Sequence, residues 1–178
     1  MKNKKVTSLV QAAMIAALYV VLTLIANAFG LASGSIQIRF SEALTILPFF
    51  TANAIPGLYI GCLLSNVVTG CALPDIIFGP LATLLGALGT WALGTAAKKV
   101  NAKTAPKRAQ LCKYLSPLPP VLANALIIPP VLKYAYGVIP MWFSFVTVTI
   151  GEIVSCGIFG LILLAALEKY RGALFPQD

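Results

Sequence analysis

The chain has 178 residues, of which 59% are hydrophobic and only 10% are charged, and its mean hydropathy is +0.91. This composition excludes an ordinary soluble globular domain and predicts an all-α integral membrane protein whose residues 1–178 form one transmembrane domain. The formal net charge is +8. Because the basic residues gather in short groups beside apolar runs, they indicate membrane orientation and not a nucleic-acid-binding patch.

The first apolar run covers about residues 6–29, long enough to cross a hydrocarbon core of roughly 30 Å. It follows Lys2, Lys4 and Lys5, and no small-residue cleavage site clearly ends it, so we expect a retained span and not a removed signal peptide. Two overlapping Ala-x-x-x-Ala pairs predict a helix-docking face, although alanine is also simply a good helix former. These alanines are Ala12, Ala13, Ala16 and Ala17.

The next apolar stretch follows a predicted loop at residues 30–35 and is too long for one span at 1.5 Å per residue. Prolines within it favour a break near residues 51–55. The sequence therefore predicts two short segments, at 38–52 and 54–69. The second segment also carries a GxxxG packing notch, formed by Gly57 and Gly61.

Three more apolar segments complete the chain. One follows a break at residues 69–75 and ends near residue 97, and the others cover about 116–134 and 140–167. Prolines in the 116–134 segment predict kinks. Residues 98–113 contain six basic residues and no acidic one, which predicts a soluble connection.

The basic groups at residues 2–5, 98–113 and 169–171 should all face the cytoplasm. An even number of crossings must then separate successive groups, which holds if residues 38–69 cross twice. The sequence thus predicts six spans with both termini cytoplasmic, in a multi-pass protein of a prokaryotic cell membrane. A re-entrant hairpin over residues 38–69 would satisfy the same parity.

Charged side chains inside the apolar segments are the best candidates for function, since each costs about 2.5 to 3.5 kcal/mol on insertion. Glu152 is the strongest, because it lies about 12 residues, or roughly 18 Å, into the last span. Each candidate also has a structural interpretation. Arg39 and Glu42 could pair at i,i+3 spacing, Asp75 could cap a helix, and Glu152 or Asn124 could join two helices by hydrogen bonds.

Carboxylates grouped with an amide and aromatic rings suit a flat solute rich in hydrogen-bond donors. A carboxylate can accept two parallel hydrogen bonds from an amidine-like edge such as that of guanine, and aromatic faces can sandwich the ring. The predicted binding residues are Glu152, Glu42, Asn124, Arg39, Asp75, Phe78, Tyr59 and Trp142, with Tyr134 as a further aromatic.

No enzyme, cofactor or metal is predicted. Histidine is absent and the four cysteines form no CxxC pair, so the usual metal sites and a disulfide framework lack support. The chain has no G-x-x-x-x-G-K-[ST], G-x-S-x-G or H-E-x-x-H motif, which counts against ATP hydrolysis by this chain and against a hydrolase.

Three stretches of the sequence resemble the QueT family of queuosine-precursor transporters. They are IQIRFSEALTILPFF at residues 36–50, AIPGLYIGC at 54–62 and DIIFGPLATL at 75–84, and the Arg-x-Ser-Glu-Ala-Leu motif within the first is the most specific. The resemblance extends over nearly the whole chain, including its length and the alanine face of the first segment.

The resemblance implies the substrate-binding S component of an energy-coupling factor (ECF) transporter. Such a chain would bind queuine or a preQ-type 7-deazaguanine on the outer side. Its alanine face would dock on a transmembrane coupling subunit driven by two cytoplasmic ATPases. An S component for another vitamin or nucleobase is one alternative, and a membrane scaffold or enzyme with structural carboxylates is another.

Overall fold

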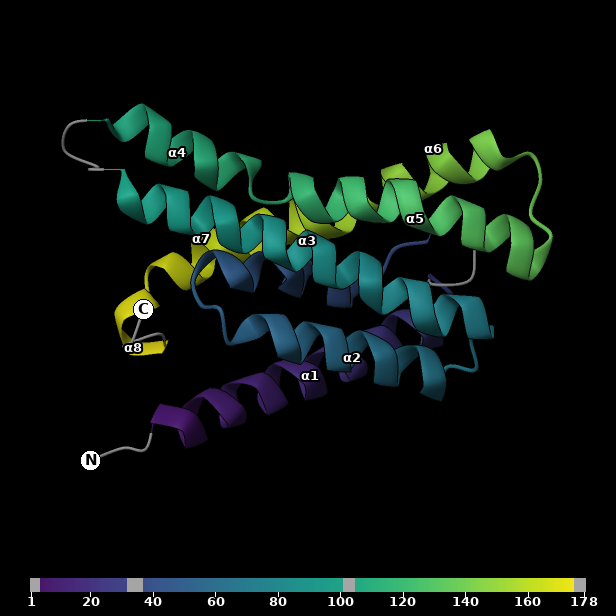
Figure 1. Ribbon diagram of the computed structural model, residues 1–178, viewed down its shortest axis with the longest axis horizontal. Helices are drawn as coiled ribbons and strands as arrows, with labels where there is room; N and C mark the ends of the chain where they lie inside the picture. The colour runs from purple at the N-terminus through teal and green to yellow at the C-terminus, as the bar shows by residue number, and fades with distance from the viewer. Residues whose placement is uncertain (1–3, 32–36, 101–104, 175–178) are drawn as a thin grey trace.

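The computed structural model describes residues 4–31, 37–100 and 105–174, and these residues form a bundle of helices without a strand (Figure 1). The all-α prediction is therefore confirmed for the described part of the chain. The helices are α1 (Lys4–Ala28), η1 (Phe40–Phe49), α2 (Ala54–Val68), α3 (Leu73–Lys99), α4 (Pro106–Leu115), α5 (Leu118–Tyr136), α6 (Met141–Glu152), η2 (Ile153–Phe159), α7 (Gly160–Glu168) and α8 (Arg171–Leu174).

Four helical stretches are long and apolar enough to cross a membrane. They are Lys5–Ala28, Leu73–Lys99, Pro106–Tyr136 and Met141–Glu168. The two remaining apolar helices, η1 and α2, are shorter. The 15 residues of α2 reach about 22 Å, less than a hydrocarbon core of roughly 30 Å. The predicted number of six crossings stays a prediction.

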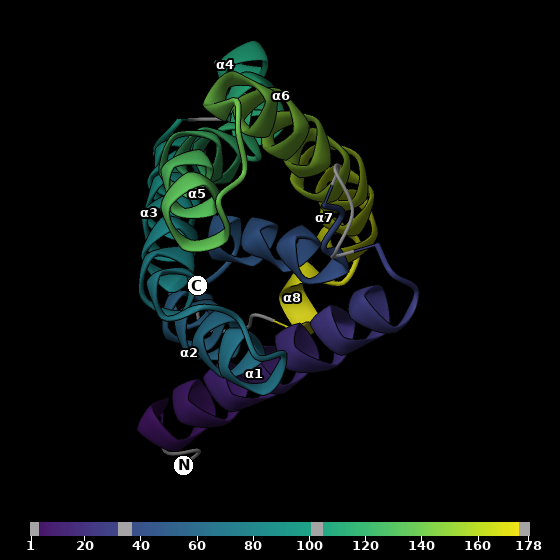
Figure 2. The same ribbon diagram turned by 90° about the vertical axis from the view of Figure 1, so that its right-hand side faces the viewer.

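The helix η1 occupies the centre of the bundle. Figure 2 shows it between α1 and α2 on one side, α3 and α5 on another, and α6 and α7 on a third, and its contacts with α1, α2, α3, η2 and α7 agree. Every residue from Ser41 to Phe49 is buried. Most of these residues are apolar, which favours burial, but the helix also carries Ser41, Glu42 and Thr45 into the interior. η1 is a 3₁₀ helix of 10 residues, an unusual length for that geometry.

The predicted GxxxG notch of α2 receives α1. A β-carbon added to Gly57 would come within 2.6 Å of the Ala12 carbonyl oxygen, and one added to Gly61 within 2.7 Å of the Tyr19 β-carbon. Only glycine leaves room for this approach. α1 and α2 therefore pack closely, and this packing fixes Tyr19 at the centre of the molecule, where it is 1% exposed.

The two ends of the bundle differ in charge. Figure 1 shows the start of α1, the helix α4 and the helix α8 at one end, with the α2–α3 turn and the α5–α6 connection at the other. Most of the described basic residues collect at the first end, and the exceptions are Arg39 and Lys133. The basic residues at the first end are Lys4, Lys5, Lys98, Lys99, Lys107, Arg108, Lys113, Lys169 and Arg171, while Lys2 and Lys103 lie outside the described residues.

Several predicted boundaries need correction. The basic stretch predicted as a soluble connection is largely helical, because α3 continues to Lys99 and α4 begins at Pro106. α5 runs through Pro129 and Pro130 without ending, and it stops at Tyr136, two residues beyond the predicted segment. The break expected at residues 51–55 is confirmed, since η1 ends at Phe49 and α2 begins at Ala54. The predicted loop at 30–35 lies mostly outside the described residues.

Candidate functional site

A small closed pocket lies among η1, α2, α3, α5 and α6. Its volume is about 20 Å³, room for about one water molecule. Its lining includes acidic and amide side chains that lie far apart in the sequence, Gln37, Glu42, Asn124 and Glu152. The lining residues are Gln37, Arg39, Glu42, Cys62, Gly79, Thr83, Asn124, Ile128, Val148 and Glu152.

Glu42 projects from the first turn of η1 into this pocket and is only 2% exposed. The Tyr19 hydroxyl donates a short hydrogen bond to its Oε1. Its Oε2 has no hydrogen-bond partner among the described residues. A buried carboxylate oxygen without a donor is costly, so Glu42 has an unfilled capacity to accept a hydrogen bond or a positive charge.

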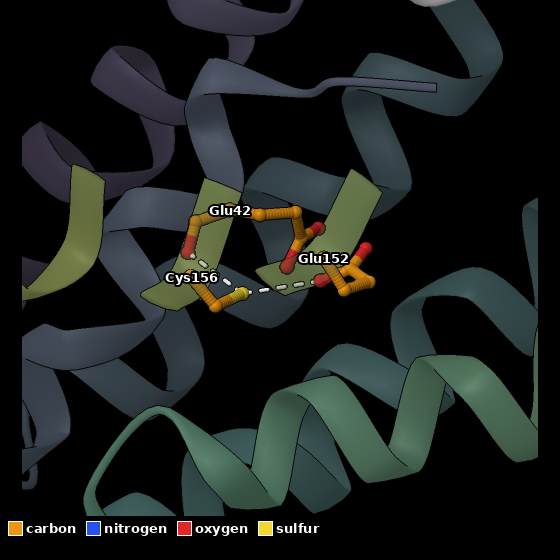
Figure 3. A group of neighbouring side chains, drawn as sticks. All are labelled: Glu42, Glu152 and Cys156. Atoms are coloured by element: carbon orange, nitrogen blue, oxygen red, sulfur yellow. Dashed lines mark hydrogen bonds between the residues drawn. The ribbon is translucent and has the colours of Figure 1, made fainter. Parts of the chain in front are cut away.

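Glu152 is the last residue of α6 and is followed by the π-helical η2 (Ile153–Phe159). Cys156 lies one turn later, and its Sγ donates to Glu152 Oε2 at 3.1 Å and contacts the Glu42 carbonyl oxygen at 3.5 Å. Figure 3 shows these two contacts and the carboxylates of Glu42 and Glu152 turned toward the same space. π-helical turns often occur at functional sites.

The three side chains Glu42, Glu152 and Cys156 form one buried group. One carboxylate oxygen from each glutamate and the Cys156 sulfur all lie within 4.8 Å of one another. These atoms could ligate a cation, a possibility that the spacing of the cysteines in the sequence does not suggest. Cys62 and Cys156 are both buried, and each also has a polar contact, Cys62 with the Thr83 hydroxyl and Cys156 with Glu152.

A second, larger cavity lies next to the closed pocket at the end of the bundle that carries the α2–α3 turn. Its volume is about 410 Å³, and it is more open. Gln37 and Arg39 line both spaces, so they form the boundary between them. We call this cavity the vestibule. Its other lining residues are Thr23, Asn27, Asn66, Thr69, Gly70, Cys71, Asp75, Leu132, Tyr136 and Val138.

An ion pair stands at this boundary. Arg39 Nη2 lies 3.9 Å from Asp75 Oδ2, and the Tyr136 hydroxyl donates to the same oxygen at 3.3 Å. Burial disfavours a charge on Arg39, but an arginine guanidinium stays protonated in proteins, and Asp75 lies beside it. Arg39 is thus a fixed positive charge. It pairs with Asp75 and not with Glu42, which corrects the i,i+3 pairing considered from the sequence.

The backbone near Arg39 is held from α6 and η2. The Arg39 amide donates to Ser155 Oγ at 3.2 Å. Gly151 lies so close to the Gln37 carbonyl that an added β-carbon would collide with it. The last span therefore positions both ends of this short segment, Gln37 as well as Arg39.

Comparison with known proteins identifies the family. The QueT transporter family model matches residues 9–169, which is most of the chain. The chain belongs to the QueT transporter family. It is 39% identical over 85 residues to the "Queuosine precursor transporter QueT" of Lactococcus lactis subsp. cremoris (strain MG1363), a match that covers 48% of this chain and 50% of that protein. The chain thus spans about half the length of this curated relative. No solved structure matches it.

The structure gathers most of the polar residues that the sequence proposed for this QueT-family chain. Glu42, Glu152, Asn124 and Arg39 all line the closed pocket, although they come from separate elements. Asp75 lies in the vestibule beside Arg39. It lies in the first turn of α3, as predicted, but the N-cap residue is Ala72 and Asp75 makes no capping hydrogen bond there.

The predicted aromatic residues do not line either space. Phe78 and Tyr134 border a separate apolar groove, Trp142 is 68% exposed, and Tyr59 lines none of the described cavities. Helical geometry explains Phe78, since the pocket-facing side of α3 continues at four-residue spacing. These pocket-facing residues are Asp75, Gly79 and Thr83.

Several residues in or beside the two cavities have no local sequence pattern that marks them as functional. Gln37 lies in a short extended segment, and Thr83 and Cys62 look like ordinary packing residues of apolar helices. Tyr19 could have been found, because a tyrosine inside a span needs a hydrogen-bond partner for its hydroxyl. The partner, Glu42, lies 23 positions away on another helix.

The alanine face of α1 is divided by the fold. Ala16 is buried and Ala12 is half-buried against the glycines of α2, whereas Ala13 and Ala17 are exposed. The four alanines therefore do not form one free surface. Only the exposed pair remains available for contact with another protein.

Proposed function

We propose that this chain is the substrate-binding membrane subunit of an uptake system for a queuosine precursor, a 7-deazaguanine such as queuine or a preQ-type base. Membership of the QueT transporter family and the name of the Lactococcus lactis relative support the substrate class. The observation that carries the proposal is the convergence of Glu42, Glu152 and Asn124 on one buried pocket.

The chemistry of that pocket fits a guanine-like edge. An N1-H and a 2-amino group are two parallel donors, which a carboxylate accepts with good geometry. Glu42 Oε2 has no partner among the described residues, so a donor placed there would gain a hydrogen bond without breaking one. The amides of Asn124 and Gln37 can bind the carbonyl side of the same ring.

The pocket as it stands is too small for a bicyclic base, since about 20 Å³ holds roughly one water molecule. The vestibule, at about 410 Å³, is within the usual size range of ligand pockets. Substrate would therefore enter the vestibule first. Movement of the Gln37–Arg39 boundary would then join the two spaces around the base.

We place the vestibule on the outer side of a prokaryotic cell membrane. The opposite end of the bundle carries most of the described basic residues, which favour the cytoplasm, whereas Arg39 and Lys133 lie toward the vestibule. This orientation agrees with six crossings and two cytoplasmic termini. Energy would come from partner subunits of the ECF type, a transmembrane coupling subunit and two ATPases, and this chain would itself be neither an enzyme nor in need of a cofactor.

The first experiment is a thermal-shift and affinity measurement on detergent-purified protein with guanine, queuine, preQ1, riboflavin and thiamine. We expect stabilisation by the deazaguanines. Glu42→Gln and Glu152→Gln should each weaken binding at least about tenfold, which corresponds to about 1.4 kcal/mol. Glu168→Gln is the control, because Glu168 pairs with Lys113 at the basic end, away from the pocket. Stabilisation by riboflavin or thiamine alone would contradict the substrate assignment.

Docking on a coupling subunit would use the exposed alanines of α1. Ala13→Leu together with Ala17→Leu should reduce co-purification of that subunit while substrate affinity is retained. Leu126→Trp, at a position of α5 that is 66% exposed, is a control for bulk on another face. Unchanged co-purification of the alanine variant would exclude this face.

A further inference from the structure

We propose that the site selects a 7-deazaguanine whose 7-substituent carries a positive charge, such as an ammonium, over a neutral one of the same size. This inference rests on the proposed function and adds the charge of the substrate to it. It follows from the balance of charges in the two cavities and from the free acceptor of Glu42.

The charges lining the two cavities do not balance. Arg39 is the one cation among their lining residues, and it faces three carboxylates, those of Glu42, Glu152 and Asp75. The ion pair of Arg39 is with Asp75. In the part of the chain that the structure describes, the other ion pair is Lys113 with Glu168, so Glu42 and Glu152 have no cationic partner.

The hydrogen bonds present do not replace that partner. Tyr19 donates a hydrogen bond to Glu42, and Cys156 and Asn124 bond to Glu152, but all three groups are neutral. Glu42 Oε2 is left without any donor, although the side chain is 2% exposed. Buried carboxylates are normally paired with a cation or satisfied by several donors, so Glu42 can accept a further donor or a positive charge.

A guanine-like edge alone would not supply a positive charge to these carboxylates. The edge offers two hydrogen-bond donors but carries no net charge, and it can occupy one carboxylate. The second carboxylate lies close by, since the oxygens of Glu42 and Glu152 that face the group are within 4.8 Å. A positive charge on the same ligand would pair with this second carboxylate. It would thereby remove the repulsion between the two glutamates.

The test compares two ligands that differ only in this charge, 7-aminomethyl-7-deazaguanine and 7-hydroxymethyl-7-deazaguanine. Both have the same ring and nearly the same size, and the hydroxymethyl group is neutral. Affinities would be measured by calorimetry on the full chain in detergent. We expect the aminomethyl compound to bind at least about tenfold more tightly. In Glu42→Gln and in Glu152→Gln this preference should fall to about threefold or less, while Glu168→Gln keeps it.

The outcomes separate the two proposals. If neither compound binds, the proposed function fails. If both bind with equal affinity, or the hydroxymethyl compound binds more tightly, the function stands and the charge selection is overturned, because the glutamates are then neutralised by retained protons. Should a glutamine variant fail to fold, the ratio of affinities in the unaltered protein still decides the question.

Discussion

Two pairs of charged residues at the cavities, Arg39 with Asp75 and Glu42 with Glu152, lie side by side but are built differently. At the vestibule, Arg39 and Asp75 have opposite charges, and Tyr136 adds a hydrogen bond. Deeper in, Glu42 and Glu152 are both acidic, and the side chains that bond to them, Tyr19, Cys156 and Asn124, are neutral. Each pair leaves one buried carboxylate oxygen without a hydrogen-bond partner, Asp75 Oδ1 and Glu42 Oε2, but only the first pair contains a cation. Buried charges that compensate each other can serve the fold, and those that do not are the better candidates for binding.

The largest effect should come from breaking the compensated pair. Arg39→Gln leaves the carboxylate of Asp75, which is 3% exposed, without its cation. We expect a loss of about 1 to 3 kcal/mol of stability, since a buried polar group loses its partner. Thermal unfolding in detergent would measure it. The double variant Arg39→Gln with Asp75→Asn should recover part of the loss, and equal losses in the single and double variants would contradict the pairing.

The uncompensated pair should respond in the opposite sense. Glu42→Gln removes a buried charge that has no cation, so the unliganded protein should unfold at the same or a higher temperature, by up to about 1 kcal/mol. Substrate affinity should fall in the same variant, as proposed above. A clear loss of stability without substrate would show that Glu42 serves the fold, which is the structural interpretation of the buried carboxylates.

Gly151→Ala should have a smaller effect on substrate affinity. It would move the Gln37–Arg39 segment that separates the two pairs. The added methyl group would collide with the Gln37 carbonyl and displace the short segment that ends at Arg39. We expect substrate affinity to fall about threefold, which is less than 1 kcal/mol. Gly157→Ala is a matched control, because its added β-carbon would come no closer than 3.8 Å to a neighbouring atom.

The smallest effect is expected from the aromatic residues that the fold places elsewhere. Trp142→Ala removes a ring that is 68% exposed and lines neither cavity. Substrate affinity should change less than about twofold. A tenfold loss would show that the α6 end closes over the bound base, and the distinction between the two cavities would then need revision.

The structural class and most of the helices follow from local features of the sequence. Apolar length and composition predict an all-helical membrane chain, and the glycine spacing of α2 predicts close packing, because both depend on residues near one another in the chain. The buried charges also stand out locally, since an isolated glutamate in an apolar run is costly anywhere in it. The family could be suggested from motifs such as Arg-x-Ser-Glu-Ala-Leu for the same reason.

Which charged side chains meet depends on the tertiary fold. Arg39 lies three positions from Glu42 yet pairs with Asp75, because η1 follows a 3₁₀ course through the centre and the first turn of α3 reaches its end. Cys156 contacts Glu42 across 114 positions of sequence, with no local signal of that proximity. The aromatic residues predicted to bind substrate lie elsewhere for a related reason. The sequence does not show which face of a helix is covered by the neighbouring helices.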